Sequence, residues 1–376
     1  MSIENRLRFR IGDPTWNNNH LLITLVQAAR TLIVDCGPMH LPKRIAHQVT
    51  DICISHRHMD HLMGFPSVAR TLLASRRPIR VIGPRGIARG LSDMLRAFEW
   101  NYRQELSMKL DVTEVVDAKT INVGRLDIRR SFSAGERQSG ERTPVLHSDA
   151  ELEITAFDLD HHTVPCLGFA FRLPDEWRVD MEKVDALGVR TGPWLGELLR
   201  QLERGERPAD DALVPPPIGR ARGGKAAPGT GGTGGTGGAD DHPSVPLARV
   251  ADEAITHQRG LLVGYVSDTG STPAVRARLR EHLTAADVLF CEAFFANSEE
   301  SQARKVGHLT SGQAGEIARE LGVGQLVVTH ISQRYNPARI MREVRDVFPE
   351  AVPKTKFMLG DDDADDDAPG EDDAEV

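Results

Sequence analysis

The sequence predicts a layered α/β fold in which two sheets are buried between helices. Two observations indicate this class. Several apolar runs continue without a polar break, for example TLIVDCG (31–37) and GLLVGYVSD (260–268), so both faces of these strands should be covered. Strands also come first in groups and then alternate with segments of helical periodicity, which is typical of α/β domains.

The expected elements can be given in chain order. Strand-like runs cover residues 31–37, 49–56, 79–83, 126–134, 151–160, 167–173, 260–268, 287–295, 325–332 and 354–359. Helical periodicity covers residues 64–76, 86–100, 194–205, 273–284, 311–321 and 337–347. One helix start is well marked, because Ser271 and Thr272 precede Pro273, an N-cap followed by proline in the first turn.

We expect a single domain over residues 1–360 that carries two insertions and an acidic tail. The stretch GRARGGKAAPGTGGTGGTGGADDHPSVP (219–246) is too rich in glycine and threonine to pack, and strand-like sequence resumes after it. This predicts a disordered insert of about 215–247 in a loop, which costs little closure entropy. Residues 361–376 are expected to form a disordered, solubilising tail.

The tail accounts for the net charge of −8, since it holds ten acidic residues and no basic ones. The remaining 46 basic and 44 acidic residues nearly balance, and such a body neither requires nor excludes a nucleic-acid partner. A further hypothesis is that the tail competes with a polyanionic substrate for a basic site.

Composition favours a cytoplasmic protein without a membrane partner. No apolar run approaches the roughly 18 residues of a membrane helix, and the N-terminus shows no signal peptide. The four cysteines are isolated in the sequence, without the paired spacing of a zinc ribbon or a disulfide framework. Buried free thiols are expected for most of them.

The segment His-Arg-His-Met-Asp-His (56–61) places four metal-binding side chains in six positions at the end of a strand-like run. Without a cation, side chains packed this densely would repel one another, and their desolvation would cost free energy that nothing offsets. His56 and His58 alternate and can point at one ion, whereas Asp60 and His61 follow in a turn and can point at a neighbouring one. Imidazole with carboxylate ligation suits zinc, with manganese or iron possible.

Other candidate ligands also stand where apolar runs end. They are His161 and His162, Asp268, and His330. Strand ends that feed loops are where sites gather in α/β folds, although a lone histidine there is more often structural. A carboxylate that bridges two cations would complete a two-metal site, and metals roughly 3.5–4 Å apart typify phosphoester hydrolysis.

These motifs resemble the metallo-β-lactamase superfamily and, within it, the ribonuclease Z family of tRNA 3′-processing endonucleases. SHRHMDHLMGFP is similar to the family's His-x-His-x-Asp-His-x-x-Gly-Leu-Pro, and HTVPCLGFAF (162–171) to its His-x-x-Pro-x-x-Gly-Tyr. VSDTG (266–270), GHLTSGQAGEIA (307–318) and VVTHISQRY (327–335) follow in the family's order. The resemblance covers residues from about 22 to about 335.

The resemblance implies an αββα sandwich with two divalent metal ions, most simply Zn²⁺. By position it assigns His56, His58 and His162, rather than His161, to the first metal, and Asp60, His61 and His330 to the second, with Asp268 as the bridge. The implied mechanism is attack by a metal-bound hydroxide on a phosphodiester. His308 would act as general acid, Glu292 would orient it, Asp60 would also serve in catalysis, and Arg334 would contact phosphate.

The stretch 179–206 resembles the family's protruding arm that grips tRNA, and the match is marked by Gly192 and Pro193. An arm of about 174–212 would therefore bind the substrate, and an ordinary amphipathic helix over 194–205 is the plainer interpretation. Precursor tRNA is the implied partner, and a homodimer is implied by the family.

The sequence departs from the family at two places near the expected site. Cys291 stands where the family has the histidine of its His-Glu-Ala-Thr motif, and VDCG is followed by PMHLPKRI. Asp35 keeps the place of a carboxylate that would steady the ligand loop. Two alternatives stay open, a hydrolase of this fold that acts on a small phosphodiester or other small molecule, and a divergent RNA-binding paralogue.

Overall fold

The computed structural model describes residues 3–11, 19–39, 41–214 and 245–357. These fall into two compact units, one built from the chain up to Leu173 and from Leu261 onward, the other from Pro174–Gly260. Most of the expected Gly/Thr-rich insert, residues 215–244, and the whole acidic tail lie outside the described residues.

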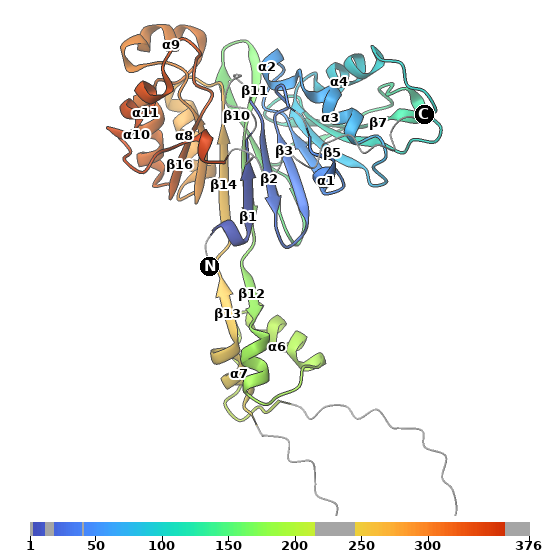
Figure 1. Cartoon of the computed structure of the whole chain (residues 1–376), viewed down its shortest axis with the longest axis vertical. Helices are drawn as coiled ribbons and strands as arrows, with labels where there is room; N and C mark the ends of the chain where they lie inside the picture. The colour runs from blue at the N-terminus through green and yellow to red at the C-terminus, as the bar shows by residue number, and fades with distance from the viewer. Residues whose placement is uncertain (1–2, 12–18, 40, 215–244, 358–376) are drawn as a thin grey trace, which may run out of the picture. The chain divides into compact units, whose positions relative to one another are not determined.

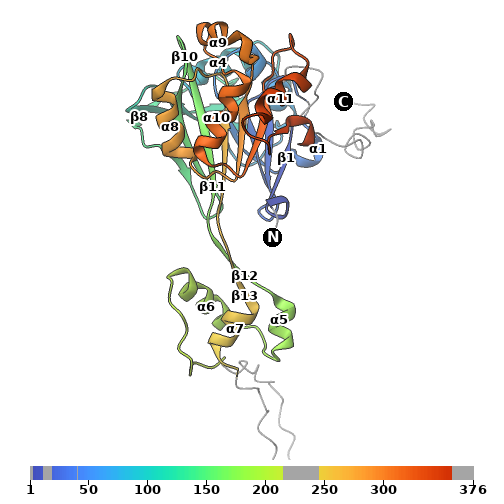
Figure 2. The ribbon, with the colours of Figure 1, turned by 90° about the vertical axis from the view of Figure 1, so that its left-hand side faces the viewer.

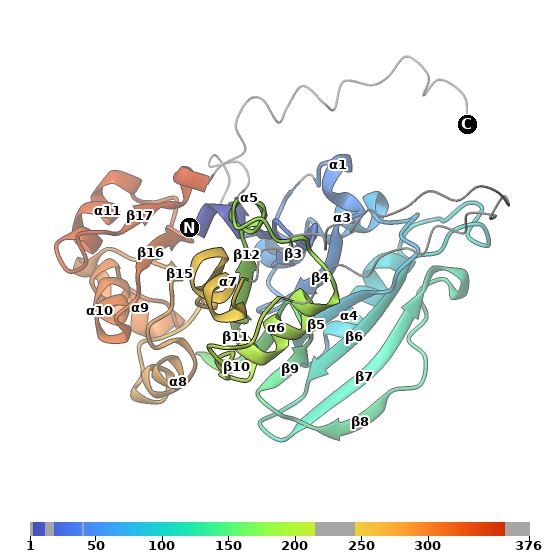
Figure 3. The same ribbon diagram turned by 90° about the horizontal axis from the view of Figure 1, so that it is seen from below.

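The first unit contains an eight-stranded sheet whose spatial order is the chain order, and its strands from β3 to β8 can be followed in Figure 3. Its strands are β1 (Leu7–Arg10), β2 (Leu21–Leu25), β3 (Arg30–Val34), β4 (Val49–Cys53), β5 (Ile79–Pro84), β6 (Lys109–Val115), β7 (Thr120–Asp127) and β8 (Gln138–Glu141). Neighbouring strands from β3 to β6 are parallel, and the outer pairs are antiparallel.

A seven-stranded sheet in the same unit has the order β17-β16-β15-β14-β11-β10-β9. Its strands are β9 (Val145–Ser148), β10 (Glu153–His161), β11 (Val164–Leu173), β14 (Leu261–Val266), β15 (Val288–Glu292), β16 (Gln325–Thr329) and β17 (Val352–Pro353). From β14 to β17 the strands are parallel, so the loops after β14, β15 and β16 leave from the same edge.

Alternation along the strands builds three apolar layers. In β3, Leu32 and Val34 pack between the two sheets, whereas Ile33 packs on the outer helices. In β15, Phe290 belongs to the layer between the sheets and Leu289 to the opposite outer layer. β3 and β15 are therefore buried on both faces, as their uninterrupted apolar sequences predict.

Helices cover the outer face of each sheet (Figures 1 and 2). On the eight-stranded sheet they are α1 (Lys43–Ala46), α2 (Met59–Leu62), α3 (Phe65–Thr71) and α4 (Ile87–Arg96). On the other sheet they are α8 (Pro273–Leu283), α9 (Glu300–Val306), α10 (Ser311–Leu321) and α11 (Pro337–Arg345). The layers run helix, sheet, sheet, helix, which confirms the expected α/β sandwich. The described helices include none that is long and apolar enough to cross a bilayer.

The second unit is inserted between β11 and β14 and has its own small core. It consists of β12 (Glu176–Val179), α5 (Met181–Ala186), α6 (Pro193–Glu203), α7 (Leu247–Ala254) and β13 (Ile255–Gln258), with β12 and β13 antiparallel. Val184, Leu198 and Val250 are buried in this core. The arm expected over 174–212 falls within this unit, and α7 and β13 belong to it as well.

Two expected strands are wrong. Residues 126–134 end β7 and then turn through the short 3-10 helix η2 (Ile128–Arg130), because Asp127 caps that helix and Ser131 and Phe132 take left-handed backbone angles. The described part of 354–359 forms the 3-10 helix η4 (Lys354–Phe357). Further short 3-10 helices are η1 (Ile3–Asn5) and η3 (Asn297–Glu299).

Candidate metal centre

The dense histidine segment leaves β4 and enters α2. His56 and His58 lie in the extended part of this connection, and His58 is the N-cap residue of α2. The single turn of α2 then presents Asp60 and His61, with the His61 amide donating to the His58 carbonyl at 3.1 Å. Extended and helical backbone thus aim the two halves of one hexapeptide at two neighbouring points.

Two glycines let α2 pack tightly on the loop after β3. A Cβ on Gly37 would come within 2.5 Å of the Asp60 carbonyl oxygen, and one on Gly64 within 2.0 Å of the Gly37 carbonyl oxygen. The Cys36 amide donates to the His61 carbonyl at 2.7 Å. Only glycine fits at both positions, so these contacts fix where α2 holds its ligands.

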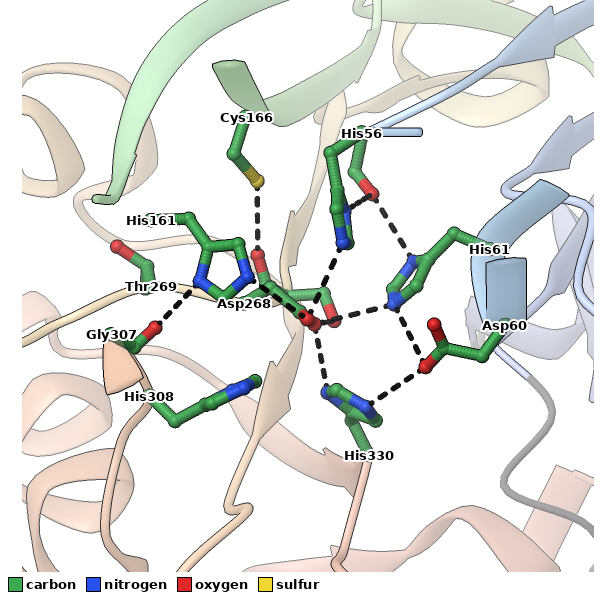
Figure 4. A network of polar contacts seen from close by, with 12 residues as sticks. His56, Asp60, His61, His161, Cys166, Asp268, Thr269, Gly307, His308 and His330 are labelled. Carbon is green, nitrogen blue, oxygen red and sulfur yellow. Dashed lines mark hydrogen bonds and ion pairs between the residues drawn. The ribbon is translucent and has the colours of Figure 1, made fainter. Parts of the chain in front are cut away.

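Asp268 joins the two halves of the site (Figure 4). It follows β14, and its Oδ2 lies 3.5 Å from His56 Nε2 and 3.8 Å from His161 Nε2. Its Oδ1 lies 3.3 Å from His61 Nε2 and 2.8 Å from His330 Nδ1. One carboxylate therefore faces two sets of imidazoles with its two oxygens, which is the geometry of a bridging ligand.

The potential ligand atoms form compact groups. Within each group these atoms lie within 4.8 Å of one another. The first group is His56, His58, His161 and Asp268, and the second is Asp60, His61 and His330. A third group consists of Asp268, Glu292, His308 and His330. The first two match the donor sets of two adjacent divalent cations that share Asp268.

The buried nitrogen of His56 is the clearest sign that the site fits a metal. Burial lowers the pKa of His56 to about 2, so its imidazole is neutral. Its Nε2 is buried and has no hydrogen-bond partner, although a carboxylate oxygen lies 3.5 Å away. An unpartnered buried polar atom is costly, and a cation between the two atoms would satisfy both.

Charges at the second group also favour a cation. Burial disfavours a charged imidazole, yet Asp268 and Asp35 outweigh it and raise the pKa of His61 to about 10. Burial likewise opposes ionisation of Asp60, but its hydrogen bond with His330 and the charge of His61 lower its pKa to about 2. The carboxylates thus demand positive charge at this point, which a proton or a metal ion can supply.

Asp35 supports the ligand loop from behind. Its buried carboxylate accepts hydrogen bonds from the Ser55 amide (2.7 Å), the Ser55 hydroxyl (2.7 Å) and the Tyr265 hydroxyl (2.8 Å). It also lies 2.7 Å from His61 Nδ1, so that nitrogen carries a proton in either charge state of the ring, and Nε2 faces the site. This is the supporting role expected for Asp35.

Three residues of the centre have left-handed backbone angles that side chains other than glycine seldom adopt. They are Asp35 (φ 57°), Asp268 (φ 54°) and His330 (φ 45°). Such conformations cost free energy and persist where the surroundings impose them, which is common at functional sites.

The partly buried His308 and the buried Glu292 form a pair beside the second group. His308 Nδ1 lies 2.7 Å from Glu292 Oε2, and Glu292 Oε1 accepts from the Thr269 amide at 2.6 Å. Burial disfavours the charged form of His308, but Glu292 outweighs it and raises the pKa of His308. The pair therefore favours an imidazolium whose free nitrogen is Nε2.

The assignment of His162 as a ligand is contradicted by the position of its neighbour. His161 ends β10 opposite Val164 of β11, which leaves His162 and Thr163 as a two-residue hairpin loop. His161 is buried, and its Nδ1 lies 2.9 Å from the Gly307 carbonyl oxygen, so Nε2 faces Asp268. His162 is exposed in the turn with φ 55° and belongs to none of the ligand groups.

Replacing His161 by alanine should remove the metal of the first group, because only His56, His58 and Asp268 would remain to hold it. The affinity loss should exceed the roughly 10–100-fold that follows removal of a supporting group. Replacing the adjacent His162 by alanine is the matched control and should leave two metals per chain. The metal content of the two purified variants measures this. Loss of metal in the His162 variant alone would show that His162, and not His161, is the ligand.

The other expected site residues belong to none of the ligand groups. Arg334 pairs with Glu299 at 3.1 Å and lies 5.2 Å over the ring of Phe295. Gly192 is the N-cap residue and Pro193 the first residue of α6, in the second unit. Arg334 therefore belongs to a surface ion pair, and Gly192 and Pro193 belong to the start of a helix.

Two residues with contacts at the centre are absent from the expected site. Asn19 Nδ2 lies 2.9 Å from Asp60 Oδ2 and 2.8 Å from His61 Nε2. The Phe294 ring stacks on His308, with ring centroids 4.3 Å apart. Asn19 stands in a run of polar residues without a motif, so no sequence signal pointed to it. Phe294 could have been noticed only from its position in CEAF, next to Glu292.

Comparison with known proteins gives the following similarities. A family model described as "Beta-lactamase superfamily domain" matches residues 30–179 and 229–331. The chain is 28% identical to a ribonuclease Z of Deinococcus radiodurans over 360 residues, which cover 93% of this chain and 98% of that protein. It is 30% identical to a ribonuclease Z of Salinispora arenicola over 310 residues, covering 81% and 75% respectively. A crystal structure of human tRNase Z, short form, aligns over 92% of this chain and 95% of that chain, with 15% identity and a TM-score of 0.47.

Proposed function

The chain belongs to the ribonuclease Z family of the β-lactamase superfamily, and we propose on that basis that it removes the 3′ trailer of precursor tRNA as a metal-dependent endoribonuclease. The observation that carries the proposal is the carboxylate of Asp268, whose oxygens face two imidazole sets next to the His308–Glu292 pair. Such a centre suits hydrolysis of a phosphodiester.

Two divalent cations, when bound, would activate water for attack on phosphorus and offset the charge of the phosphate. His56, His58 and His161 would hold the first, Asp60, His61 and His330 the second, and Asp268 would contact both. Zinc is the metal that this imidazole-rich donor set favours, with manganese or iron as alternatives.

Three side chains would control the proton transfers of the reaction. Asp60, whose carboxylate lies 3.6 Å from His61 Nε2 and 3.5 Å from His330 Nε2, would accept the proton of the attacking water. His308 would donate the proton on Nε2 to the departing 3′ oxygen of the ribose, so that this oxygen leaves as an alcohol. Glu292, 2.7 Å from His308 Nδ1, would hold the imidazolium in that orientation.

Further parts of the proposal concern the substrate and the cell. Arg334 would contact a phosphate of the RNA, and the arm around Gly192 and Pro193 would bind the tRNA body. A homodimer is proposed from the family. A cytoplasmic location is supported by the four buried free cysteines, which form no disulfide in the described structure.

The test is incubation of the purified, metal-loaded protein with a precursor tRNA that carries a 3′ trailer and, separately, with bis-p-nitrophenyl phosphate. Cleavage of the RNA at the trailer junction together with ester hydrolysis is expected. Hydrolysis of the ester alone would favour a small-molecule phosphodiesterase. Metal binding without either reaction would favour the RNA-binding paralogue.

A further inference from the structure

His308 is fixed by contacts of two kinds. Glu292 Oε2 lies 2.7 Å from its Nδ1, and the ring of Phe294 lies parallel to its imidazole, with centroids 4.3 Å apart and an interplanar angle of 16°. The His161 ring meets it edge-on at 5.1 Å. The hydrogen bond to Glu292 uses Nδ1, so the other ring nitrogen, Nε2, takes no part in it.

The two main contacts control different motions. The hydrogen bond to Glu292 anchors Nδ1 at one point, and because the second side-chain torsion of histidine has broad minima, this single anchor leaves the imidazole room to tilt. A face-to-face aromatic contact restricts the plane itself. The direction in which Nε2 can donate a proton therefore depends on Phe294 as well as on Glu292.

Phe294 is itself held firmly. Its carbonyl accepts a hydrogen bond from the Ser332 amide at 3.2 Å, and its half-buried ring lies 4.8 Å from the ring of His330. It lies just beyond the end of β15, after Ala293 in the sequence Cys-Glu-Ala-Phe, so Glu292 and Phe294 reach His308 from one short segment. The same segment thus supplies both the hydrogen bond and the stacking surface.

We infer that Phe294 is a positioning residue that sets the ring plane of His308 so that Nε2 can protonate the leaving oxygen. This inference rests on the general-acid role proposed above for His308. The competing explanation is ordinary packing, in which Phe294 supports the metal ligand His330 and its loss weakens the whole centre.

The two explanations differ in how the reaction responds to the leaving group. A p-nitrophenolate ion leaves without help from an acid, whereas an alkoxide needs a proton in the transition state. Loss of His308 positioning should therefore slow phosphodiesters with poor leaving groups and spare the nitrophenyl ester. Damage to the metal centre should slow all of them alike.

The experiment measures kcat for a series of phosphodiesters whose leaving phenols and alcohols differ in pKa. The proteins compared are wild type, Phe294→Leu, Phe294→Tyr, His308→Ala and the Phe294→Leu/His308→Ala double variant. We expect Phe294→Leu to lower kcat for the poorest leaving groups by roughly three- to tenfold, the size of one stacked aromatic contact. The nitrophenyl ester should change less than about twofold, so the plot of log kcat against leaving-group pKa becomes steeper. Phe294→Tyr keeps the ring and should retain the wild-type slope.

A matched control exists elsewhere in the same unit. Phe157 stacks on His282 with centroids 4.9 Å apart and the same interplanar angle of 16°. Phe157→Leu removes a comparable Phe–His pair and should leave the slope unchanged. Metal content and unfolding temperature of every variant report on folding separately.

A second readout does not depend on turnover. In metal-free protein labelled with ¹⁵N-histidine, wild type should show an Nδ1–H resonance of His308, identified by its absence in His308→Ala. That signal should broaden in Phe294→Leu, because the ring plane is freed, and stay sharp in Phe157→Leu.

Three results would overturn the inference. They are equal slowing of every ester in Phe294→Leu, a further loss in the double variant beyond that of His308→Ala, and an unchanged His308 resonance in Phe294→Leu. Failure to cleave precursor tRNA, with the ester pattern intact, would reject the proposed substrate and leave the role of Phe294 standing. A chain that binds metal but hydrolyses no phosphodiester would reject both.

Discussion

Replacing Asp268 by asparagine should release both metal ions and abolish hydrolysis of RNA and ester alike. The side chain keeps its size, but it loses the negative charge that faces His56 and His161 with one oxygen and His61 and His330 with the other. Asp268 is the sole residue of the described chain that faces both imidazole sets in this way, so neither metal retains a complete donor set.

The measurement is metal content per chain and turnover of bis-p-nitrophenyl phosphate, before and after dialysis against a chelator. Asp111→Asn is the matched control, because Asp111 pairs with Arg125 on an exposed part of β6 and should keep two metals and full activity. An Asp268→Asn protein that retained two ions would contradict the bridging role.

Replacing His308 by alanine should stop RNA cleavage while both metals stay bound. His308 contributes a proton and lies in neither of the two main ligand groups, so its loss removes general acid catalysis, worth roughly 10²–10⁴-fold in rate. The nitrophenyl ester, whose leaving group needs no proton, should be affected far less.

Single-turnover cleavage of precursor tRNA and metal content of the same preparation measure this effect. His282→Ala is a suitable control, since His282 also stacks on a phenylalanine but lies on α8, outside every ligand group. Loss of metal from the His308 variant would mean that His308 is a ligand and that another group supplies the proton.

Much of the centre could be predicted because its ligands are tied to local sequence. His56, His58, Asp60 and His61 lie within one strand end and one helical turn, so their mutual position depends on few residues. Asp268, Glu292 and His330 end or follow β14, β15 and β16, which are adjacent and parallel. Apolar strands of this kind bring their carboxyl ends to one edge, which is why these distant residues could be expected near one site, and the resemblance to the ribonuclease Z family then assigned their roles.

Other parts could not be predicted because they depend on contacts that have no local signal. Asn19 reaches Asp60 and His61 only when the start of β2 packs beside α2. The alternating polar sequence of β6 and the short β1, β2, β8 and β9 lack the long apolar runs that identify strands, and sheet partners make them strands.

The sequence by itself determined the chemical composition of this protein's site: two imidazole sets, a carboxylate between them and a histidine with an acidic partner. Only the tertiary structure decided between His161 and His162, because the hairpin register with Val164 makes His161 the buried last residue of β10 and leaves His162 exposed in the turn. The same is true of Phe294, whose contact with His308 requires the end of β15 and the loop after α9 to meet. Residue types fix what a site can bind, and packing fixes which copies of those residues take part.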